Sequence, residues 1–220
     1  MSSEFTKRVI TSFFLFTLLV LMHFYTYILI ISLIIIAIIS WIEFYALISK
    51  ILYKESLKNK IIRFIFKIFS LIYLSGIIFL VLFTKLKNQN LEIFIIYPLL
   101  ISISTDIGGI FFGKVFKGKK LTNLSPNKTI SGSVGSFLFS LLLIPFFDEK
   151  MLNLSFIKLV IFTLLISLTS QIGDILISAM KRKAKVKDTS DLLPGHGGFL
   201  DRIDGMLLAL PFGFMLLKFL

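Results

Sequence analysis

Long apolar runs, separated by short polar segments, dominate this chain. Several runs hold about 20 consecutive apolar residues, the length that an α-helix needs to cross a bilayer. The runs are continuous rather than alternating, and lipid offers no hydrogen-bond partner to open backbone, so helices are expected and a barrel is not. We predict spans at residues 9–22, 26–48, 64–84, 91–112, 130–147, 156–180 and 202–220.

These runs predict an all-α fold, a polytopic transmembrane helical bundle of about seven spans with room for one more re-entrant segment. The chain is 56% hydrophobic with a mean hydropathy of +0.94, which leaves too little polar surface for a soluble domain. The first span is short, like the core of a signal peptide, but no small-residue cleavage site follows it, so an uncleaved helix is expected. Residues 23–27 predict a turn, and residues 1–220 are expected to form one membrane domain.

Basic residues predict the orientation of the chain. Most of its 24 lysines and arginines fall on one side of a seven-span arrangement, and the exceptions are Lys85, Lys87, Lys150, Lys158 and Lys218. Basic loops remain in the cytoplasm, so the N-terminus and three large loops are expected there. The net charge of +12 then points to anionic lipid headgroups rather than to nucleic acid. Because the chain has no cysteine, disulfides and thiolate metal sites are excluded.

Polar residues gather near the end of the sixth predicted span. Asp174 lies in an apolar run, and Ser178 and Lys181 follow on the same face of a helix. A carboxylate within a span costs roughly a few kcal/mol unless it is paired or hydrated, so Asp174 is a candidate functional residue. The alternative is a structural aspartate that merely pairs with a nearby lysine.

The segment that follows mixes bases with acids. Its basic residues are Lys181, Arg182, Lys183, Lys185 and Lys187. Taken alone, such a run is typical of a positive-inside anchor. Asp188 and Asp191 interrupt it, and this mixture favours a site where bases hold phosphate oxygens and acids hold a bridging cation.

A glycine-rich turn and an acidic helix start complete the segment. Residues 194–198 read Pro-Gly-His-Gly-Gly, and glycines before a helix permit positive φ and can present N–H groups to phosphate. Taken alone, His196 is more typical of a structural loop residue. Asp201 and Asp204 share a face in the first helical turn, where they either complement the helix dipole or bind magnesium. Arg202 between them can clamp a phosphate.

A second polar island lies between the fourth and fifth predicted spans. Asp106 falls within a span and carries the same energetic cost as Asp174. Lys128 and Thr129 begin the fifth span and are candidates to contact phosphate, although the glycine spacing of a Walker A loop is absent. Both islands are expected on the cytoplasmic side, which favours one composite site.

The pattern of these residues resembles the signature of the phosphatidate cytidylyltransferases, also called CDP-diacylglycerol synthases. The matching positions are 178–182, 187–188, 190, 193–194, 196–199 and 201–204, with similar upstream motifs at 111–113, 125–129 and 173–174. The resemblance covers residues 100–205, whereas the first hundred residues are similar only in being apolar spans. Two positions depart from the family pattern, since Ile177 stands where a glutamate is common and Ser131 where Glu or Gln is.

The resemblance implies an activity in phospholipid biosynthesis. The family's reaction is CTP + phosphatidate → CDP-diacylglycerol + pyrophosphate, in which the lipid phosphate attacks the α-phosphorus of CTP without a protein nucleophile. It implies Mg²⁺ as cofactor and leaves a second cation open. The implied partners are CTP, phosphatidate and membrane lipids, with a homodimer left open. A bacterial inner membrane is the expected location.

The resemblance also implies roles for individual residues. The implied metal ligands are Asp174, Asp201 and Asp204, with Asp188 as a further candidate. The residues that would hold phosphates are Lys181, Arg182, Lys187 and Arg202. The phosphate loop would be shaped by His196, Gly197 and Gly198. Further contacts to substrate are expected from Lys128, Thr129 and Ser178, with Asp106 in a secondary role.

Two other classes of membrane protein match the pattern less well. A CDP-alcohol phosphatidyltransferase requires Asp-Gly-x-x-Ala-Arg, whereas Asp204 and Gly205 precede Met-Leu-Leu-Ala without an arginine. A transporter for a phosphorylated solute is expected to carry polar groups near mid-membrane, often in repeated halves. Here the polar groups crowd the ends of the spans. Magnesium-dependent release of pyrophosphate would favour the enzyme, and solute flux in vesicles would favour the transporter.

Overall fold

The computed structural model describes residues 3–87, 92–122, 125, 128–147, 154–217 and 219. Within these residues the chain is helical, with two isolated bridges and no strand. The α-helices are α1 (Ser3–Phe24), α2 (Thr26–Ile51), α3 (Leu57–Lys87), α4 (Ile93–Phe116), α5 (Ile130–Leu141), α7 (Phe156–Lys183) and α8 (Leu200–Leu216). In the described part, α1, α2, α3, α4 and α7 are long and apolar enough to cross a membrane. The chain is an integral membrane protein of the helical type.

Two of the predicted spans correspond to shorter helices. α5 has 12 residues, or about 18 Å at ~1.5 Å per residue, against a hydrocarbon core of ~30 Å. Its apolar run continues as a short 3₁₀ segment, η2 (Ile144–Phe146), because Pro145 lacks the N–H that an α-helix would use there. α8 has 17 residues, and its first turns carry charge. The structure thus supports five of the seven predicted spans by length, and the other two stay predictions.

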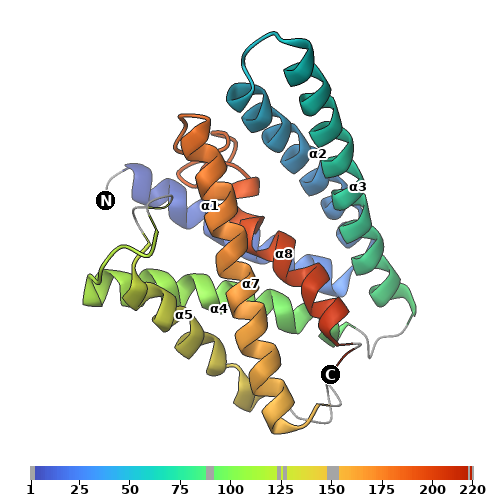
Figure 1. Ribbon diagram of the computed structural model, residues 1–220. Helices are drawn as coiled ribbons and strands as arrows, with labels where there is room; N and C mark the ends of the chain where they lie inside the picture. Colours follow the sequence, from blue (N-terminus) through green and yellow to red (C-terminus); the bar gives the residue numbers. More distant parts are fainter. Residues whose placement is uncertain are drawn as a thin grey trace. The chain divides into compact units, whose positions relative to one another are not determined.

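The chain divides into two units, which we describe separately. The first unit comprises Met1–Phe79 with Met180–Arg202, and the second comprises Leu80–Ala179 with Ile203–Leu220. In the first unit, α1 passes into α2 through a break at Tyr25, which confirms the turn predicted at residues 23–27. α2 and α3 then run side by side as a helical hairpin (Figure 1). The indole of Trp41 on α2 donates to the carbonyl of Lys67 on α3 at 3.0 Å.

The second unit contains a buried core built from α4, α7 and α8. Its central side chains, all with no exposed surface, are Tyr97, Ile101, Phe162, Ile166 and Ala209. The polar groups among them are paired: the Tyr97 hydroxyl lies 2.6 Å from that of Thr163, and Thr105 donates to Ser167 at 2.8 Å. These short hydrogen bonds satisfy polar groups that would otherwise be costly in an apolar interior.

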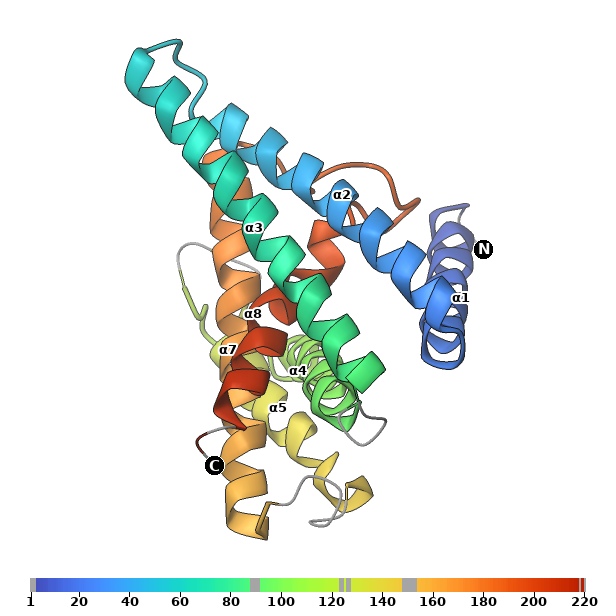
Figure 2. The same ribbon diagram turned by 90° about the vertical axis from the view of Figure 1, so that its right-hand side faces the viewer.

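Helices α4 and α5 of the second unit lie side by side and approach closely (Figure 2). A Cβ atom added to Gly108 would lie 2.6 Å from the carbonyl oxygen of Gly135. The hydroxyl of Ser136 donates to the carbonyl of Thr105 at 2.7 Å. Small residues therefore set the spacing of this helix pair, which fixes the start of α5 and the candidate residues Lys128 and Thr129 beside it.

Candidate active site

Residues 184–199, here named the signature loop, join α7 to α8. A bridge between Leu193 and Gly197 closes the turn at its tip, and the N–H groups of His196 and Gly197 donate to the Leu193 carbonyl at 2.8 and 3.1 Å. Gly195 and Gly197 have φ values of 75° and 81°, which residues with a side chain rarely adopt. The glycine-rich turn that the sequence predicts is present, and these two positions require glycine.

Asp201 organises the loop from the first turn of α8. Its Oδ2 atom accepts hydrogen bonds from the Thr189 N–H at 2.8 Å, the Thr189 hydroxyl at 2.9 Å and the Gly198 N–H at 3.1 Å. Its Oδ1 atom pairs with the ammonium group of Lys181 at 2.5 Å. Burial raises the pKa of Asp201, but the Lys181 hydrogen bond and charge and the N–H donors outweigh it and hold the pKa below its ordinary value. Asp201 is therefore an ionised and fully engaged carboxylate.

Glu43 of α2 also holds the signature loop. It was not among the site residues predicted from the sequence. Its carboxylate is buried and accepts from the Ser190 hydroxyl at 2.5 Å. It lies 2.8 Å from the Thr189 hydroxyl, whose single proton it shares with Asp201. It also accepts from the backbone N–H groups of Phe199 (3.1 Å) and Leu200 (2.8 Å). A signal was available, because Glu43 lies in the apolar run 26–48 and carries the same cost that marked Asp174 as functional.

Helix α1 supplies two further contacts to the tip of the loop. The Thr11 hydroxyl donates to the Pro194 carbonyl at 3.0 Å. The Ser12 hydroxyl lies 3.2 Å from Nε2 of His196. Hydroxyls on a membrane helix are common, so no feature of the sequence distinguishes Thr11 or Ser12 from other small polar residues.

His196 is placed to shape the loop. Burial lowers its pKa, and the nearby positive charges of Arg202 and Arg8 lower it further. The Arg202 guanidinium donates to the His196 carbonyl through both Nε, at 3.1 Å, and a terminal nitrogen. An imidazole with a pKa below its usual ~6.5 is mostly neutral at pH 7, so its hydrogen bonds rather than a positive charge are what His196 brings to the loop in this structure.

The remaining charged candidates of the first unit are more accessible. Arg182, Lys187 and Arg202 are exposed, which leaves their cationic groups open to an incoming anion. Asp188 is also exposed, and its Cβ lies 3.1 Å from the position that a side chain on Gly197 would occupy. Substituting Gly197 would therefore disturb Asp188 as well as the backbone of the turn.

In the second unit, the structure brings together two candidates that are distant in sequence. Lys128 forms an ion pair with Oδ2 of Asp174, and the Ser178 hydroxyl donates to Oδ1 of Asp174 at 3.2 Å. The side chains of Lys128 and Asp174 are 23% and 27% exposed, so this pair is more open than the pair between Lys181 and Asp201.

The start of α5 depends on Thr129 and Ser131. Thr129 caps the helix, since its hydroxyl accepts from the Gly132 N–H at 3.0 Å. Ser131 lies 3.1 Å from the Thr129 hydroxyl and accepts from the Gly118 N–H at 3.1 Å. Ser131, one of the two departures from the family pattern, thus holds the chain before α5 in place. Part of the motif at residues 125–129, at positions 126 and 127, lies outside the described residues.

Asp204 belongs to the second unit and is buried, with 6% of its surface exposed. Its Oδ1 accepts from the Gly205 N–H at 2.8 Å. Gly173 of α7 packs against the backbone here, because a Cβ at Gly173 would lie 2.6 Å from the Asp204 carbonyl oxygen. Ile177, the other departure from the family pattern, is buried. Asp106 on α4 is half-buried.

The three predicted metal ligands, Asp174, Asp201 and Asp204, are engaged by other groups of the protein. Among the described residues, no group of three or more Asp, Glu or His side chains is arranged to hold a metal ion. Carboxylate oxygens are the donors that magnesium prefers. Here, however, Asp201 and Asp174 are each neutralised by a lysine. A cation at either carboxylate would share it with that lysine or displace the lysine.

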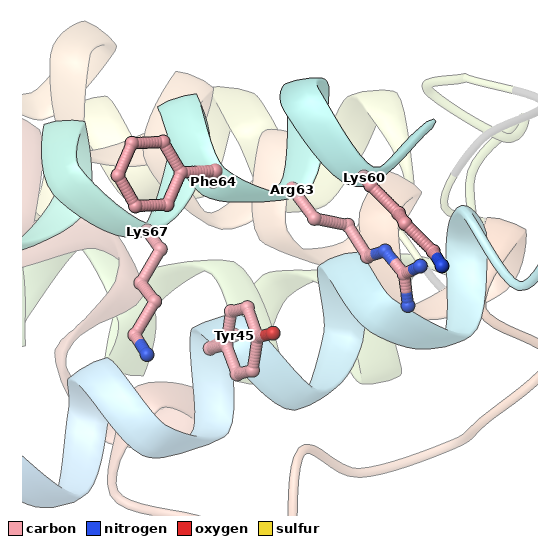
Figure 3. A pocket seen from close by; sticks show the side chains of 5 residues that line it. All are labelled: Tyr45, Lys60, Arg63, Phe64 and Lys67. Carbon is pink, nitrogen blue, oxygen red and sulfur yellow. The ribbon is translucent and has the colours of Figure 1, made fainter. Parts of the chain in front are cut away.

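A basic groove lies between α2 and α3 of the first unit, with a volume of about 310 Å³ (Figure 3). It is lined by Tyr45, Lys60, Arg63, Phe64 and Lys67. The Lys67 ammonium lies 5.1 Å from the Tyr45 ring centroid and 5.3 Å from that of Trp41, within the range of a cation–π interaction. This groove lies apart in sequence from the predicted motifs, and it adds positive charge at the end of the helical hairpin.

Comparison with known proteins identifies the family. All of residues 1–220 match the sequence model of the Cytidylyltransferase family, and the chain belongs to that family. It is 41% identical over 126 residues to a phosphatidate cytidylyltransferase of Bacillus subtilis, which covers 56% of this chain and 47% of the relative. It is 37% identical over 145 residues to the enzyme of that name from Helicobacter pylori, covering 66% and 54%. These matches span about half the length of the relatives.

Proposed function

We propose that this protein is a phosphatidate cytidylyltransferase that transfers a cytidylyl group from CTP to phosphatidate. A phosphate oxygen of phosphatidate forms a bond to the α-phosphorus of CTP, and the bond from that phosphorus to the β-phosphate bridging oxygen breaks. The products are CDP-diacylglycerol and pyrophosphate. The main support is that the signature loop, with its glycine turn, is held beside the pair of Lys181 and Asp201 in one unit of the chain. The chain belongs to the Cytidylyltransferase family.

The side chains of this protein would act by positioning and by neutralising charge. Exposed Arg182, Lys187 and Arg202 can contact the phosphate oxygens, and the glycines of the turn let its backbone come close to a ligand. Holding both phosphates in line and offsetting their charge accelerates such a transfer without a protein nucleophile. Lys128 and Lys181 are proposed to contribute in the same way, after leaving their carboxylate partners.

A magnesium requirement is part of this proposal, with Asp174, Asp201 and Asp204 as its candidate ligands. The proposal rests on the signature resemblance and on the preference of magnesium for carboxylate oxygens. In the structure, Asp174 and Asp201 are paired with lysines and Asp204 is buried. A second cation is proposed on the same basis. Titration of Mg²⁺ into the wild-type protein, followed by isothermal calorimetry with and without CTP, would measure its binding directly.

The decisive experiment is an assay of purified protein in detergent with labelled CTP and phosphatidate, with and without Mg²⁺. Magnesium-dependent formation of labelled CDP-diacylglycerol with release of one pyrophosphate per product supports the proposal. Lack of product, together with flux of a phosphorylated solute in proteoliposomes, would contradict the proposal and indicate a transporter. Omitting phosphatidate is the matched control, because it separates lipid-dependent transfer from simple hydrolysis of CTP.

We also propose that the chain has seven spans and lies in a bacterial inner membrane, with its N-terminus and basic loops in the cytoplasm. A homodimer is proposed as well. Because the chain has no cysteine, single-cysteine variants can be labelled without background. Lys54→Cys and Lys183→Cys should react with an impermeant maleimide only in inverted vesicles, and Lys87→Cys only in right-side-out vesicles. The opposite pattern would reverse the orientation. Native mass spectrometry of the detergent-solubilised protein would give its oligomeric state.

A further inference from the structure

We propose that Glu43 is a positioning residue for cytidylyl transfer, which holds the signature loop in the shape that presents Lys181 and the glycine turn to the substrate. The inference rests on the proposed function. Glu43 lies on α2, within the first hundred residues, where the sequence carries no part of the family signature. Its role follows from the contacts of its carboxylate.

The two oxygens of Glu43 accept hydrogen bonds from the signature loop and from the first residue of α8. Oε1 accepts from the Ser190 hydroxyl and the Phe199 N–H, and Oε2 accepts from the Thr189 hydroxyl and the Leu200 N–H. α8 begins at Leu200, so Glu43 satisfies N–H groups that the start of a helix leaves without partners. Its negative charge also lies at the positive end of the α8 dipole.

Glu43 is linked to the lysine–aspartate pair through one side chain. The Thr189 hydroxyl lies 2.8 Å from Oε2 of Glu43 and 2.9 Å from Oδ2 of Asp201. Asp201 in turn holds Lys181. A shift of Thr189 would therefore move Asp201 and Lys181, although the hydrogen bonds of Glu43 go to residues 189, 190, 199 and 200. This indirect link makes Glu43 a positioning residue rather than a catalytic one.

Gly198 shows how tightly the loop is packed against this carboxylate. A Cβ atom at Gly198 would lie 2.5 and 2.7 Å from the two Glu43 oxygens and would also overlap the Thr189 hydroxyl. No side chain other than hydrogen fits there without displacing Glu43 or the loop. Glycine at position 198 is thus explained by the approach of the backbone to Glu43.

Replacing Glu43 by glutamine removes the charge but keeps the shape of the side chain. It therefore tests whether the hydrogen bonds that Glu43 accepts are needed to position the loop. Glutamine has nearly the same shape, but only one of its two terminal atoms accepts hydrogen bonds. Whichever way the amide is turned, its NH₂ group faces the N–H of Phe199 or Leu200, and a backbone donor cannot rotate away. If Glu43 were only a buried charge, this neutral substitution would be tolerated or would stabilise the protein.

The test compares wild-type protein with Glu43→Gln, Glu43→Asp and the control Ser40→Ala. Ser40 is buried one turn before Glu43 on α2, and it has no part in the proposed site. Two measurements are made on each: kcat and KM for CTP, and the rate of tryptic cleavage. Cleavage at exposed Lys183, Lys185 and Lys187 reports on the loop region. Cleavage at exposed Lys54 and Lys58 reports on the connection between α2 and α3.

We expect Glu43→Gln to lower kcat/KM by about 10- to 100-fold, as is typical when a group that orients an active-site residue is removed. Loop cleavage should become several-fold faster, with cleavage at residues 54 and 58 unchanged. Glu43→Asp, which keeps both oxygens, should recover part of the activity, and Ser40→Ala should match the wild type. Wild-type kinetics and loop cleavage in Glu43→Gln would overturn the inference, as would equal acceleration of cleavage at both regions.

The proteolysis also separates this inference from the proposed function. If wild-type protein forms no CDP-diacylglycerol, the proposed function fails, whereas the loop-cleavage comparison still tests whether Glu43 holds the loop. If wild-type protein is active and Glu43→Gln is equally active with a protected loop, the proposed function stands and the role of Glu43 is refuted.

Discussion

Two regions of this chain hold candidate functional residues by different means. The signature loop of the first unit is held by hydrogen bonds to two buried carboxylates, Glu43 and Asp201. The pair of helices α4 and α5 in the second unit is held by close backbone packing, with Gly108 of α4 against Gly135 of α5. Hydrogen bonds to a carboxylate depend on which atoms donate and accept, whereas close packing depends on side-chain volume.

The two regions should therefore respond to opposite kinds of substitution. An amide of unchanged shape should damage the loop and leave the helix pair intact. A single added methyl group should separate the helix pair and leave the loop hydrogen bonds intact.

Asp201→Asn should cause the largest change. The substitution leaves Lys181, whose side chain is 13% exposed, without its counter-charge, and removing one partner of a buried pair costs about 3–5 kcal/mol. We expect rapid tryptic cleavage of the signature loop and loss of transferase activity by at least about 100-fold. Asp191→Asn, at an exposed acid of the same loop, is the control and should leave cleavage unchanged. Wild-type protection in Asp201→Asn would show that the loop does not depend on this carboxylate.

Gly108→Ala should cause the next largest change. The added Cβ would lie 2.5 Å from Cβ of Phe139 and 2.6 Å from the Gly135 carbonyl oxygen, and such overpacking costs about 1–3 kcal/mol. The fraction of protein that stays monodisperse after heating in detergent measures this loss. Gly76→Ala on α3 is the matched control, because no atom lies within 4 Å of its added Cβ. Equal thermal stability of the two variants would contradict the packing explanation.

Asp174→Asn should affect stability little and activity strongly. Its pair with Lys128 is about a quarter exposed, and such pairs contribute about 0–1 kcal/mol. If Asp174 only pairs with Lys128, then Lys128→Gln, Asp174→Asn and the double variant should have the same residual activity. We expect instead that Asp174→Asn is less active than Lys128→Gln, as a double-mutant cycle of kcat/KM would show.

Acid should release the signature loop only below about pH 4. The folded pKa of Asp201 lies below its ordinary value, so its contribution to stability is fully present above the unfolded value of ~3.9 and is lost as pH falls through the folded pKa. Hydrogen exchange of residues 186–200 between pH 7 and pH 3, corrected for intrinsic rates, should show protection down to about pH 4. Loss of protection near pH 6 would assign the loop's stability to His196 instead.

The sequence predicted most of the helices but not all of their lengths. Apolar runs locate α2, α4 and α7 to within a few residues, because a span must be apolar over the thickness of the hydrocarbon core. The fifth predicted span, 130–147, is divided in the structure into α5 and a short 3₁₀ segment, and its crossing of the membrane stays a prediction. Apolar residues continue beyond α5, but Pro145 begins a different local structure that hydropathy does not report.

The candidate site was predictable where its residues are close in sequence. The glycine turn, Lys181 and Asp201 fall in one signature and are found together. The pairing of Lys128 with Asp174 was not assigned, because a sequence does not say which of many lysines meets a given carboxylate. Glu43 was missed because its partners are 146 to 157 residues away, and only the energetic cost of an acid in an apolar run marks it.

The separation between Glu43 and its donors has a consequence for biosynthesis. α2 emerges from the ribosome long before residues 189–200 exist, so its carboxyl group must enter the membrane without the four groups that later surround it. Early truncated chains that end before α8 should therefore hold α2 less firmly in the bilayer than the complete chain does. The order of synthesis makes the closure of the signature loop over α2 one of the last steps in the maturation of this protein.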